Sequence, residues 1–351
     1  MVARCATPGG EWSGGTLIAK VARNRFSGPQ AGVREVGFGV PKMRATDPDS
    51  TADLRAFLSR RDRGYAGTVF RGLDLARRDL SGWDLSGARL EDVDLSGANL
   101  SRSVLRSAVV SKSDLRGVVL AGTDLQGADL RGSRLMTKNV VGANLSRTLL
   151  IQADLTGADL RQTSMAGANL ERCLLVGVHA ENVDFHGCVL SDCSLEDAEL
   201  SKARFLAVRA SQTSFERADL TGAVLAGVSA PFARFAGASL NEANLDGADL
   251  TCATFVRAQV RKAMVRKAKL ARSQWSYANI TGSHFDLSDL TFADLAHAIA
   301  DLASFRNAML DHACLHRTSL ASTVLSGASL RGVRKTDPIR AKAEDFGMGG
   351  R

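Results

Sequence analysis

The residues best suited to covalent chemistry in this sequence are its six cysteines and six histidines. The sequence contains no Cys-x-x-Cys pair, nucleophile elbow, P-loop, dinucleotide fingerprint or His-Glu-x-x-His motif. If residues twenty apart stack, one face gathers Asp294, His297 and Cys314. His297 then lies about 10 Å from the other two by strand rise, whereas a nucleophile and its base need about 3 Å. We therefore expect no enzyme, no cofactor and no metal site.

The charge of the chain is concentrated at its ends. The 351 residues carry a net charge of +8, of which residues 1–67 supply +5, residues 68–332 supply +1 and residues 333–351 supply +2. The body of the protein therefore has no general basic surface, and direct nucleic-acid binding is not expected. No apolar run approaches the roughly 18 residues that a membrane span needs, so we expect no membrane span.

A period of five residues runs through most of the chain. Every fifth residue from Phe70 to Leu330, here called a centre, is Leu, Phe, Val, Met, Ile, Trp or Ala. A small residue usually lies two positions before each centre, Asp or Asn often lies one before it, and Gly often lies two after it. This period fits neither a helix nor a long strand, but it fits a short extended segment followed by a corner. Such segments bury every centre only if the chain coils and stacks on itself as a solenoid.

The repeats resemble the pentapeptide-repeat family, whose pattern is Ala-(Asp/Asn)-Leu-x-x. Good copies are Ala-Asn-Leu-Ser-Arg at 98–102, Ala-Asp-Leu-Arg-Gly at 128–132 and Ala-Asn-Leu-Asp-Gly at 243–247. The resemblance covers residues 68–332. It implies an all-β fold, a right-handed quadrilateral parallel β-helix with four pentapeptides per coil, about 13 coils and a length of roughly 60–65 Å at a coil spacing of ~4.8 Å.

A coil of twenty residues places large centres above one another. The predicted columns are one aromatic stack of Phe215, Phe235, Phe255 and Trp275, a second of Phe185 and Phe205, and a column of small centres at Ala210 and Ala230. Large centres beside small ones keep the packing density constant. Cys173, Cys188 and Cys193 occupy the small position and are predicted to be buried thiols.

The open ends of a β-helix must be covered. We divide the chain into a flexible tail (1–47), an N-terminal helical cap (48–67), the β-helix (68–332) and a C-terminal helix and tail (333–351). Asp337-Pro338 predicts the start of the C-terminal helix, with Asp337 as its N-cap, and Ile339, Ala343 and Phe346 then share an apolar face. Two roles for this helix remain open: it caps the last coil, or it pairs with a second copy in a homodimer.

Charged residues form three candidate binding surfaces. The acidic stripe consists of Asp74, Asp94, Asp114 and Asp154 in one column, interrupted by Arg134. The acidic belt consists of Glu181, Asp184, Asp192, Glu196, Asp197 and Glu199. The basic coil consists of Arg257, Arg261, Lys262, Arg266, Lys267, Lys269 and Arg272. A solvated face is the alternative for each, and adjacent patches of opposite sign otherwise suit a complementary partner or self-association. Tyr277, His297 and Arg317 form a further candidate contact patch.

These features favour a non-enzymatic interaction protein. The resemblance to gyrase-protecting members of the family implies binding to a type II topoisomerase by partial mimicry of DNA. A duplex as long as the rod would carry about 37 negative charges, so whole-rod mimicry does not fit a body of net charge +1. An exported effector or a structural scaffold that recruits another protein is the alternative. We expect a cytoplasmic protein, unless residues 1–47 are an export or organelle-targeting signal.

Overall fold

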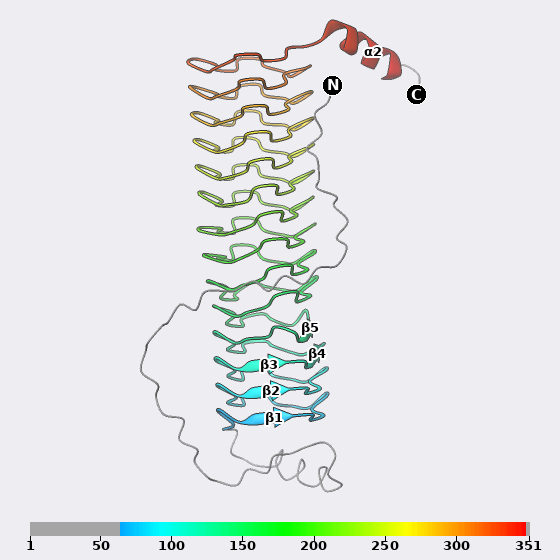
Figure 1. Cartoon of the computed structure of the whole chain (residues 1–351), viewed down its shortest axis with the longest axis vertical. Coiled ribbons are helices and arrows are strands. Elements are labelled where there is room, and N and C mark those ends of the chain that lie inside the picture. Colours follow the sequence, from blue (N-terminus) through cyan, green and yellow to red (C-terminus); the bar gives the residue numbers. More distant parts are fainter. Residues whose placement is uncertain (1–63, 349–351) are drawn as a thin grey trace, which may run out of the picture. The chain divides into compact units, whose positions relative to one another are not determined.

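The described part of the chain is built from stacked coils. The computed structural model describes residues 64–348, so the predicted tail (1–47) and residues 48–63 of the predicted N-terminal cap lie outside the described residues, while residues 64–67 of that cap belong to the first coil and are not helical. The coils lie one above another along a rod, and helix α2 follows the last coil (Figure 1). Coil geometry is present from Gly64, which bridges Asp84, to Arg334, which bridges Cys314. It therefore extends slightly beyond the range 68–332 inferred from the repeats.

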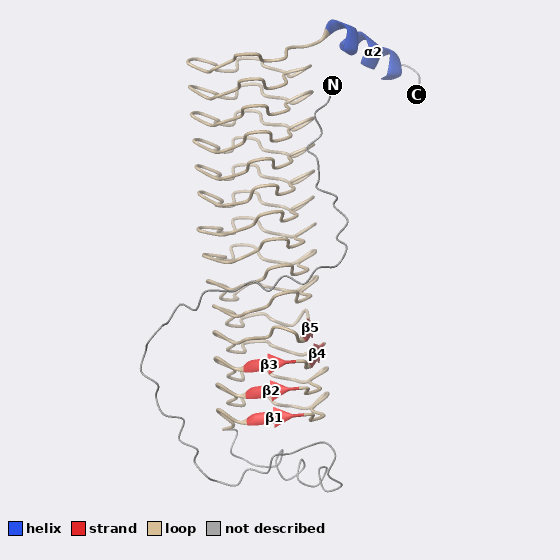
Figure 2. Cartoon of the chain, in the orientation of Figure 1, coloured by secondary structure: helices blue, strands red, loops and turns tan. Residues whose placement is uncertain are grey.

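The strands are short because each side of a coil holds about three extended residues between two corners. They form two parallel sheets, ordered β1-β2-β3 and β4-β5. The bounds of the elements are β1 Val69–Arg71, β2 Arg89–Glu91, β3 Val109–Ser111, β4 Asp114–Arg116, β5 Arg134–Met136 and α2 Pro338–Met348. Phe70 pairs with Leu90 and Leu90 with Val110, so residues twenty apart are in register. Single bridges continue this register through the later coils, which appear as loops in Figure 2.

Each pentapeptide closes with a β-turn at its corner. The carbonyl of Leu85 accepts the N–H of Ala88 at 3.0 Å, and Gly87, two residues after the centre, has a φ of 63°. Positive φ recurs at every fifth residue from Gly67 to Gly332 except Thr137. A type II turn requires this conformation, which Gly adopts without steric cost. Larger residues also occupy many corners, so the stacked coils impose the conformation on them.

The centres and the small residues fill the interior of the rod. The predicted aromatic stack is confirmed: ring centroids are 5.0 Å apart for Phe215 and Phe235, 4.9 Å for Phe235 and Phe255, and 3.9 Å for Phe255 and Trp275. The second stack, Phe185 on Phe205, has a spacing of 5.1 Å. All of these rings are fully buried. Burial of the centres is therefore the main stabilising contribution to the fold.

The three predicted buried thiols are confirmed. Cys173, Cys188 and Cys193 are 0–2% exposed. The Cys173 thiol donates to the carbonyl of Leu150 in the preceding coil, with Sγ and O 2.9 Å apart. Burial raises the pKa of Cys173 and of Cys188 to about 12. These cysteines therefore act as small core residues and not as nucleophiles.

Helix α2 begins as the sequence predicts. The Asp337 side chain accepts the N–H groups of Ile339 and Arg340 at 2.9 and 3.2 Å. Ile339, on the predicted apolar face, is 83% exposed. Centres of the last coil are only partly buried, and Leu330 is 42% exposed. The described residues therefore leave apolar surface open at this end of the rod.

Candidate functional site

The first three aspartates of the acidic stripe stack as predicted. Asp74 bridges Asp94, and Asp94 bridges Asp114. Each carboxylate accepts the backbone N–H two residues ahead, as Asp74 does from Ala76 at 3.0 Å. The side chains therefore cap corners of the coil as well as carrying charge. Asp74 and Asp94 are exposed and have no ion-pair partner within residues 64–348.

The third aspartate of the stripe is neutralised by arginines. The Arg116 guanidinium forms two hydrogen bonds with the Asp114 carboxylate, with Nη2 and Oδ2 2.6 Å apart. Arg134 lies 3.8 Å from the same carboxylate. The hydrogen bond from Arg116 lowers the pKa of Asp114, so this group stays ionised and paired. Free negative charge in the stripe is thus concentrated at its first two members.

The prediction that Asp154 stacks on Arg134 is wrong, because the register slips by two residues. Asp154 bridges Met136, and the Thr137 N–H donates to the Asp154 carbonyl at 3.2 Å. Thr137 is buried at the small position, which the repeat assigns to Lys138. A lysine cannot be buried there without a partner. The chain therefore omits the corner at Thr137 and leaves Lys138 exposed.

The acidic belt surrounds the rod instead of forming one face, and arginines of neighbouring coils neutralise much of it. Arg217, directly above Asp197, contacts its carboxylate at 2.8 Å. Arg217 and Arg234 both approach Glu196, at 3.7 and 3.9 Å. The sequence window 173–201 lacks Lys and Arg, so the sequence shows no cation close to these acids. The cations that do pair with acids of the belt come from the neighbouring coils. The spacing of twenty residues between Asp197 and Arg217 could have revealed this pair.

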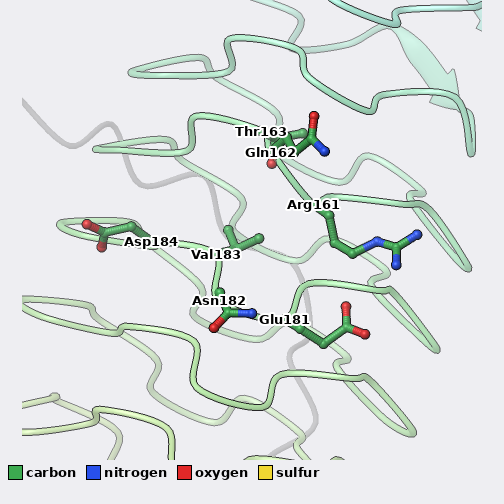
Figure 3. A pocket seen from close by; sticks show the side chains of 7 residues that line it. All are labelled: Arg161, Gln162, Thr163, Glu181, Asn182, Val183 and Asp184. Carbon is green, nitrogen blue, oxygen red and sulfur yellow. The ribbon is translucent and has the colours of Figure 1, made fainter.

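A cavity of about 620 Å³, lined by residues that are mostly of polar type, lies beside the remaining belt acids. Figure 3 shows Arg161, Glu181 and Asp184 among its lining residues. In the described chain Glu181 Oε2 is buried without a hydrogen-bond partner. On the same side of the rod the His179 ring lies 2.7 Å from Glu199, which raises the pKa of His179 and lowers that of Glu199. Ligand pockets are usually lined by apolar and aromatic side chains, so this cavity suits a polar side chain of a partner better than a small substrate.

The basic coil surrounds the rod, with one cation at each corner. Arg257, Lys262, Lys267 and Arg272 have φ values of 55–60°. These four cations have no carboxylate partner within residues 64–348. On the flat sides, Arg266 pairs with Asp246 at 2.5 Å and Lys269 pairs with Asp249 at 3.6 Å. The Arg261 guanidinium donates from Nε to the neutral amide oxygen of Asn241 at 3.4 Å. The unpaired positive charge therefore points outward in four directions.

Aromatic or apolar side chains lie directly above three of these four cations, and Gly282 lies above the fourth, Lys262. The Arg272 guanidinium is 5.8 Å from the centroid of the Phe292 ring, which stacks on His312. Tyr277 stacks on His297 with a centroid distance of 4.6 Å, as the column mapping predicts. Tyr277 and Phe292 are about half exposed. The sequence showed few aromatics among the cations because these partners are twenty residues away.

A cluster of charged groups attaches α2 to the last coils. Glu344 Oε2 lies 3.1 Å from His316 Nε2, 3.4 Å from His297 Nε2 and 3.4 Å from Arg317 Nε. These hydrogen bonds and charges, led by the bond from His316, lower the pKa of Glu344 to about 2. The helix therefore contacts the rod through polar side chains, while Ile339 stays exposed.

This cluster is the one group in the described residues with the donors for a metal ion, since ligand atoms of His297, His316 and Glu344 lie within 4.8 Å of one another. However, His316 Nδ1 accepts the Asp337 N–H at 3.1 Å. A neutral imidazole that accepts at Nδ1 carries its proton on Nε2, so Nε2 donates to Glu344 and has no lone pair for a metal. The nearby Arg317 cation also disfavours a metal ion. The geometry instead fits a polar contact that attaches α2 to the last coils, here called the polar latch.

Cys314, the candidate nucleophile, also has a structural position. Cys314 bridges Asp294 and is 7% exposed. Asp294 uses its carboxylate to accept the Ala296 N–H and the Ser276 hydroxyl. His297 turns toward Glu344, and within residues 64–348 it forms no hydrogen bond with Cys314. The three side chains therefore do not form a nucleophile–base pair.

The stacked pentapeptide coils define the class of protein, and the family comparison agrees. The family model "Pentapeptide repeats" matches eight stretches of the chain, at 66–102, 98–135, 141–175, 168–205, 181–215, 232–263, 288–327 and 301–334. The chain belongs to the pentapeptide-repeat family, and its fold is the right-handed β-helix predicted from the repeats. Among curated proteins, no sequence matches the chain.

Solved structures of pentapeptide-repeat proteins are similar to this chain. One is QnrB1, a plasmid-mediated fluoroquinolone resistance protein, at 20% identity over 59% of this chain and 97% of that chain, with a TM-score of 0.43. Another is HetL from the cyanobacterium Nostoc, involved in the regulation of heterocyst differentiation, at 25% identity over 80% of this chain and 94% of that chain, with a TM-score of 0.23. No helix in the described residues is long and apolar enough to span a bilayer.

Proposed function

We propose that this protein is a non-enzymatic interaction module that binds and protects a type II topoisomerase, DNA gyrase, through the acidic stripe. The observation that carries the proposal is the pair of exposed carboxylates of Asp74 and Asp94, which lie one coil apart and have no ion-pair partner within residues 64–348. The coil spacing of ~4.8 Å is comparable with the ~3.4 Å between phosphates of one DNA strand. Arg116 and Arg134 neutralise Asp114, so the mimicry is local. The resemblance of the repeats to gyrase-protecting members of the family supplies the class of partner.

A supercoiling assay tests this proposal. The full-length protein is titrated into DNA gyrase with and without a fluoroquinolone, and we expect inhibition of supercoiling or rescue from the drug at low micromolar protein. No effect in either condition would refute the gyrase proposal. A gyrase partner also places the protein in the cytoplasm.

A double variant identifies the surface responsible. The double variant Asp74→Asn and Asp94→Asn removes both charges but keeps a side-chain oxygen that can cap the corner. Asn99 caps the N–H of Ser101 in this way. We expect the effect on gyrase to weaken at least tenfold with unchanged thermal stability. Asp219→Asn is the matched control, because Asp219 caps the Thr221 N–H on a different side of the rod. An equal loss with the control would show that the stripe is not the binding surface.

A scaffold or effector that recruits another protein is the second candidate, and the cations at the corners of the basic coil favour it. Their charge is not neutralised within residues 64–348, and apolar side chains lie next to it, a combination typical of interaction surfaces. The full-length protein is compared in pull-downs with the double variant Arg257→Ser and Lys267→Ser. A partner that binds both equally would refute a role for this surface.

The exposed face of α2 favours the second of the two roles left open for the C-terminal helix, pairing with a second copy in a homodimer. Ile339 is 83% exposed beside a last coil whose centres are only partly buried. Pairing of two such ends would bury both apolar surfaces. Ile339→Glu is expected to abolish such a dimer in sedimentation experiments, because it would place a carboxylate in the contact. An unchanged dimer would exclude this interface.

A further inference from the structure

One side of the rod carries small or compact residues beside its corner in the middle coils. This side, here called the Phe232 face, is formed by residues 189–192, 209–212, 229–232, 249–252 and 269–272. Bridges connect it from coil to coil through Val189, Arg209, Ser229, Asp249 and Lys269. The outward residues next to the corner are small or compact, namely Ser191, Ser211, Pro231, Thr251 and Ala271. Such a surface can approach another flat surface closely.

Phe232 projects from this face at the corner of its middle coil. Its side chain is 57% exposed, and its φ is 60°. A bulky residue in this conformation is uncommon and costs conformational energy. The ring contributes nothing to the core in return, because the centres Ala230 and Phe235 point inward and fill it. Tyr277 and Phe292 also present exposed rings at such corners, so the surroundings of Phe232 on this face must decide what its ring contacts.

The charges on this face have opposite signs at equal distances from Phe232. In the corner column, Asp192 lies two coils before Phe232 and Arg272 lies two coils after it. Both are exposed, and neither has an ion-pair partner within residues 64–348. In the bridged column, Arg209 lies one coil before Ser229 and Asp249 lies one coil after it. The pattern is therefore self-complementary on reversal of the rod.

We propose that two copies of this protein pair side by side and antiparallel through the Phe232 face. A two-fold axis in the interface, perpendicular to both rods at the level of Phe232, places each coil after Phe232 opposite the equivalent coil before it in the partner. Asp192 then faces the partner's Arg272 twice by symmetry. Arg209 faces the partner's Asp249 as well, although Lys269 already contacts Asp249 within each chain at 3.6 Å, so the Asp192–Arg272 pairs are the main charge contacts. Phe232 packs against the partner's Phe232 on the axis.

The match continues toward the edges of the interface. Arg172 faces the partner's Phe292, which suits a cation–π contact. Leu149 faces the partner's Met309, which is 48% exposed. No two residues of like charge face each other in these columns between Leu149 and Met309. Because the contact is isologous, this interface taken alone closes on two copies.

The size of the face sets the strength of the pair. Three extended residues between corners span about 10 Å, and nine coils at ~4.8 Å span roughly 40 Å. The two copies together therefore bury on the order of 800–1,000 Å², less than the ~1,200–2,000 Å² of stable complexes. The dimer is accordingly transient. The charged groups that pair in the dimer are exposed to solvent in the monomer, and dissolved salt screens their attraction. Added salt therefore weakens the dimer.

Sedimentation velocity of the full-length protein tests this proposal, which is independent of the partner proposed above. We expect a reversible monomer–dimer equilibrium that shifts toward monomer in high salt. Asp192→Arg and Arg272→Asp each place like charges opposite one another and should raise the Kd at least tenfold. A mixture of these two variants should form a heterodimer, because the reversed charges then match. Formation of that heterodimer also shows that both variants are folded.

Three outcomes would overturn the proposal. The first is a wild-type protein that stays monomeric up to about 1 mM, where even a contact of about 4 kcal/mol is populated. The second is a mixture of the charge variants that gives no heterodimer. The third is a dimer abolished by Ile339→Glu but unaffected at Asp192 and Arg272, since this dimer would be joined at the C-terminal ends. Glu242→Arg, on a corner outside the Phe232 face, is the matched control and should leave the Kd unchanged.

Discussion

Replacement of Phe235 by alanine is the sharpest test of the packing described here. The ring is 0% exposed and lies between Phe215 and Phe255, at centroid distances of 5.0 and 4.9 Å. Loss of a buried Phe ring typically costs about 3–5 kcal/mol. We expect the upper half of this range, because each stacked pair adds about 0.5–1.5 kcal/mol. The hydrogen bond from the Phe235 N–H to the Thr254 carbonyl, at 2.7 Å, holds the coil in place and limits collapse into the cavity.

Phe232→Ala is the matched control, since it makes the same substitution three residues earlier. Its ring is 57% exposed, so the change should alter the free energy of unfolding by no more than about 0.5 kcal/mol. Urea unfolding is followed by circular dichroism and by Trp275 fluorescence, because the Trp275 ring lies 3.9 Å from Phe255 in the same stack. Protein concentrations are kept below those that give dimers. Equal destabilisation by the two substitutions would show that the inward and outward positions are misassigned.

Three further predictions concern buried or paired ionisable groups. Leu125→Lys places an unpaired ammonium where the side chain is 1% exposed and should cost about 4 kcal/mol or more; an unchanged melting temperature would contradict the coil register. Burial raises the pKa of Cys173 to about 12, so iodoacetamide at pH 8 should alkylate it only after unfolding, and the contribution of the neutral thiol to stability should be lost as the pH rises from about 9 towards 12. The pKa of Glu344 is lowered to about 2, so the contribution of its ionised carboxylate to stability is fully present above the unfolded pKa near 4.5 and is lost as the pH falls towards 2. A titration of the Glu344 carboxyl by NMR with a midpoint above 4 would refute the polar latch.

The positions of the centres could be predicted from the sequence because burial is a strong constraint. A polar residue at Leu95 or Phe235 would lose solvation inside a narrow rod, so the period survives in every coil. The aromatic columns followed from the same constraint, because four segments per coil fix a vertical repeat of twenty residues. The thiols of Cys173 and Cys188 were predictable for the same reason: the small position leaves no room for a larger side chain.

The surface could be predicted less well, because one residue type serves two purposes there. Asp at the position before a centre reads as a binding charge, but Asp94 also caps the N–H of Ser96. Other surface charges are neutralised by residues of a neighbouring coil, as Asp197 is by Arg217. Such pairs are not adjacent in the sequence. The slip at Thr137 had one signal in the sequence, Lys138 at a small position, but the sequence does not show which neighbour replaces it.

The end of the chain was predictable in its local structure but not in its packing. Asp337 and Pro338 determine where α2 begins, because capping depends only on adjacent residues. The contact of α2 with the rod depends on His297, His316 and Glu344, which are separated by up to 47 positions in the sequence. The helix therefore packs through the charged side chains, and its apolar side, read from periodicity as the packing face, is exposed at Ile339.

The two proposed interfaces occupy neighbouring sides of the rod and can be separated. The column of Asp74 and Asp94 lies on the side that follows the Phe232 face around the coil, so an antiparallel pair leaves it open on both copies. Asn at Asp74 and Asp94 should therefore abolish the effect on gyrase without changing the dimer Kd. Arg272→Asp should weaken the dimer and leave the effect of the monomer on gyrase unchanged. If Arg272→Asp abolishes both, and the mixture with Asp192→Arg restores both, the dimer is the form that binds the topoisomerase.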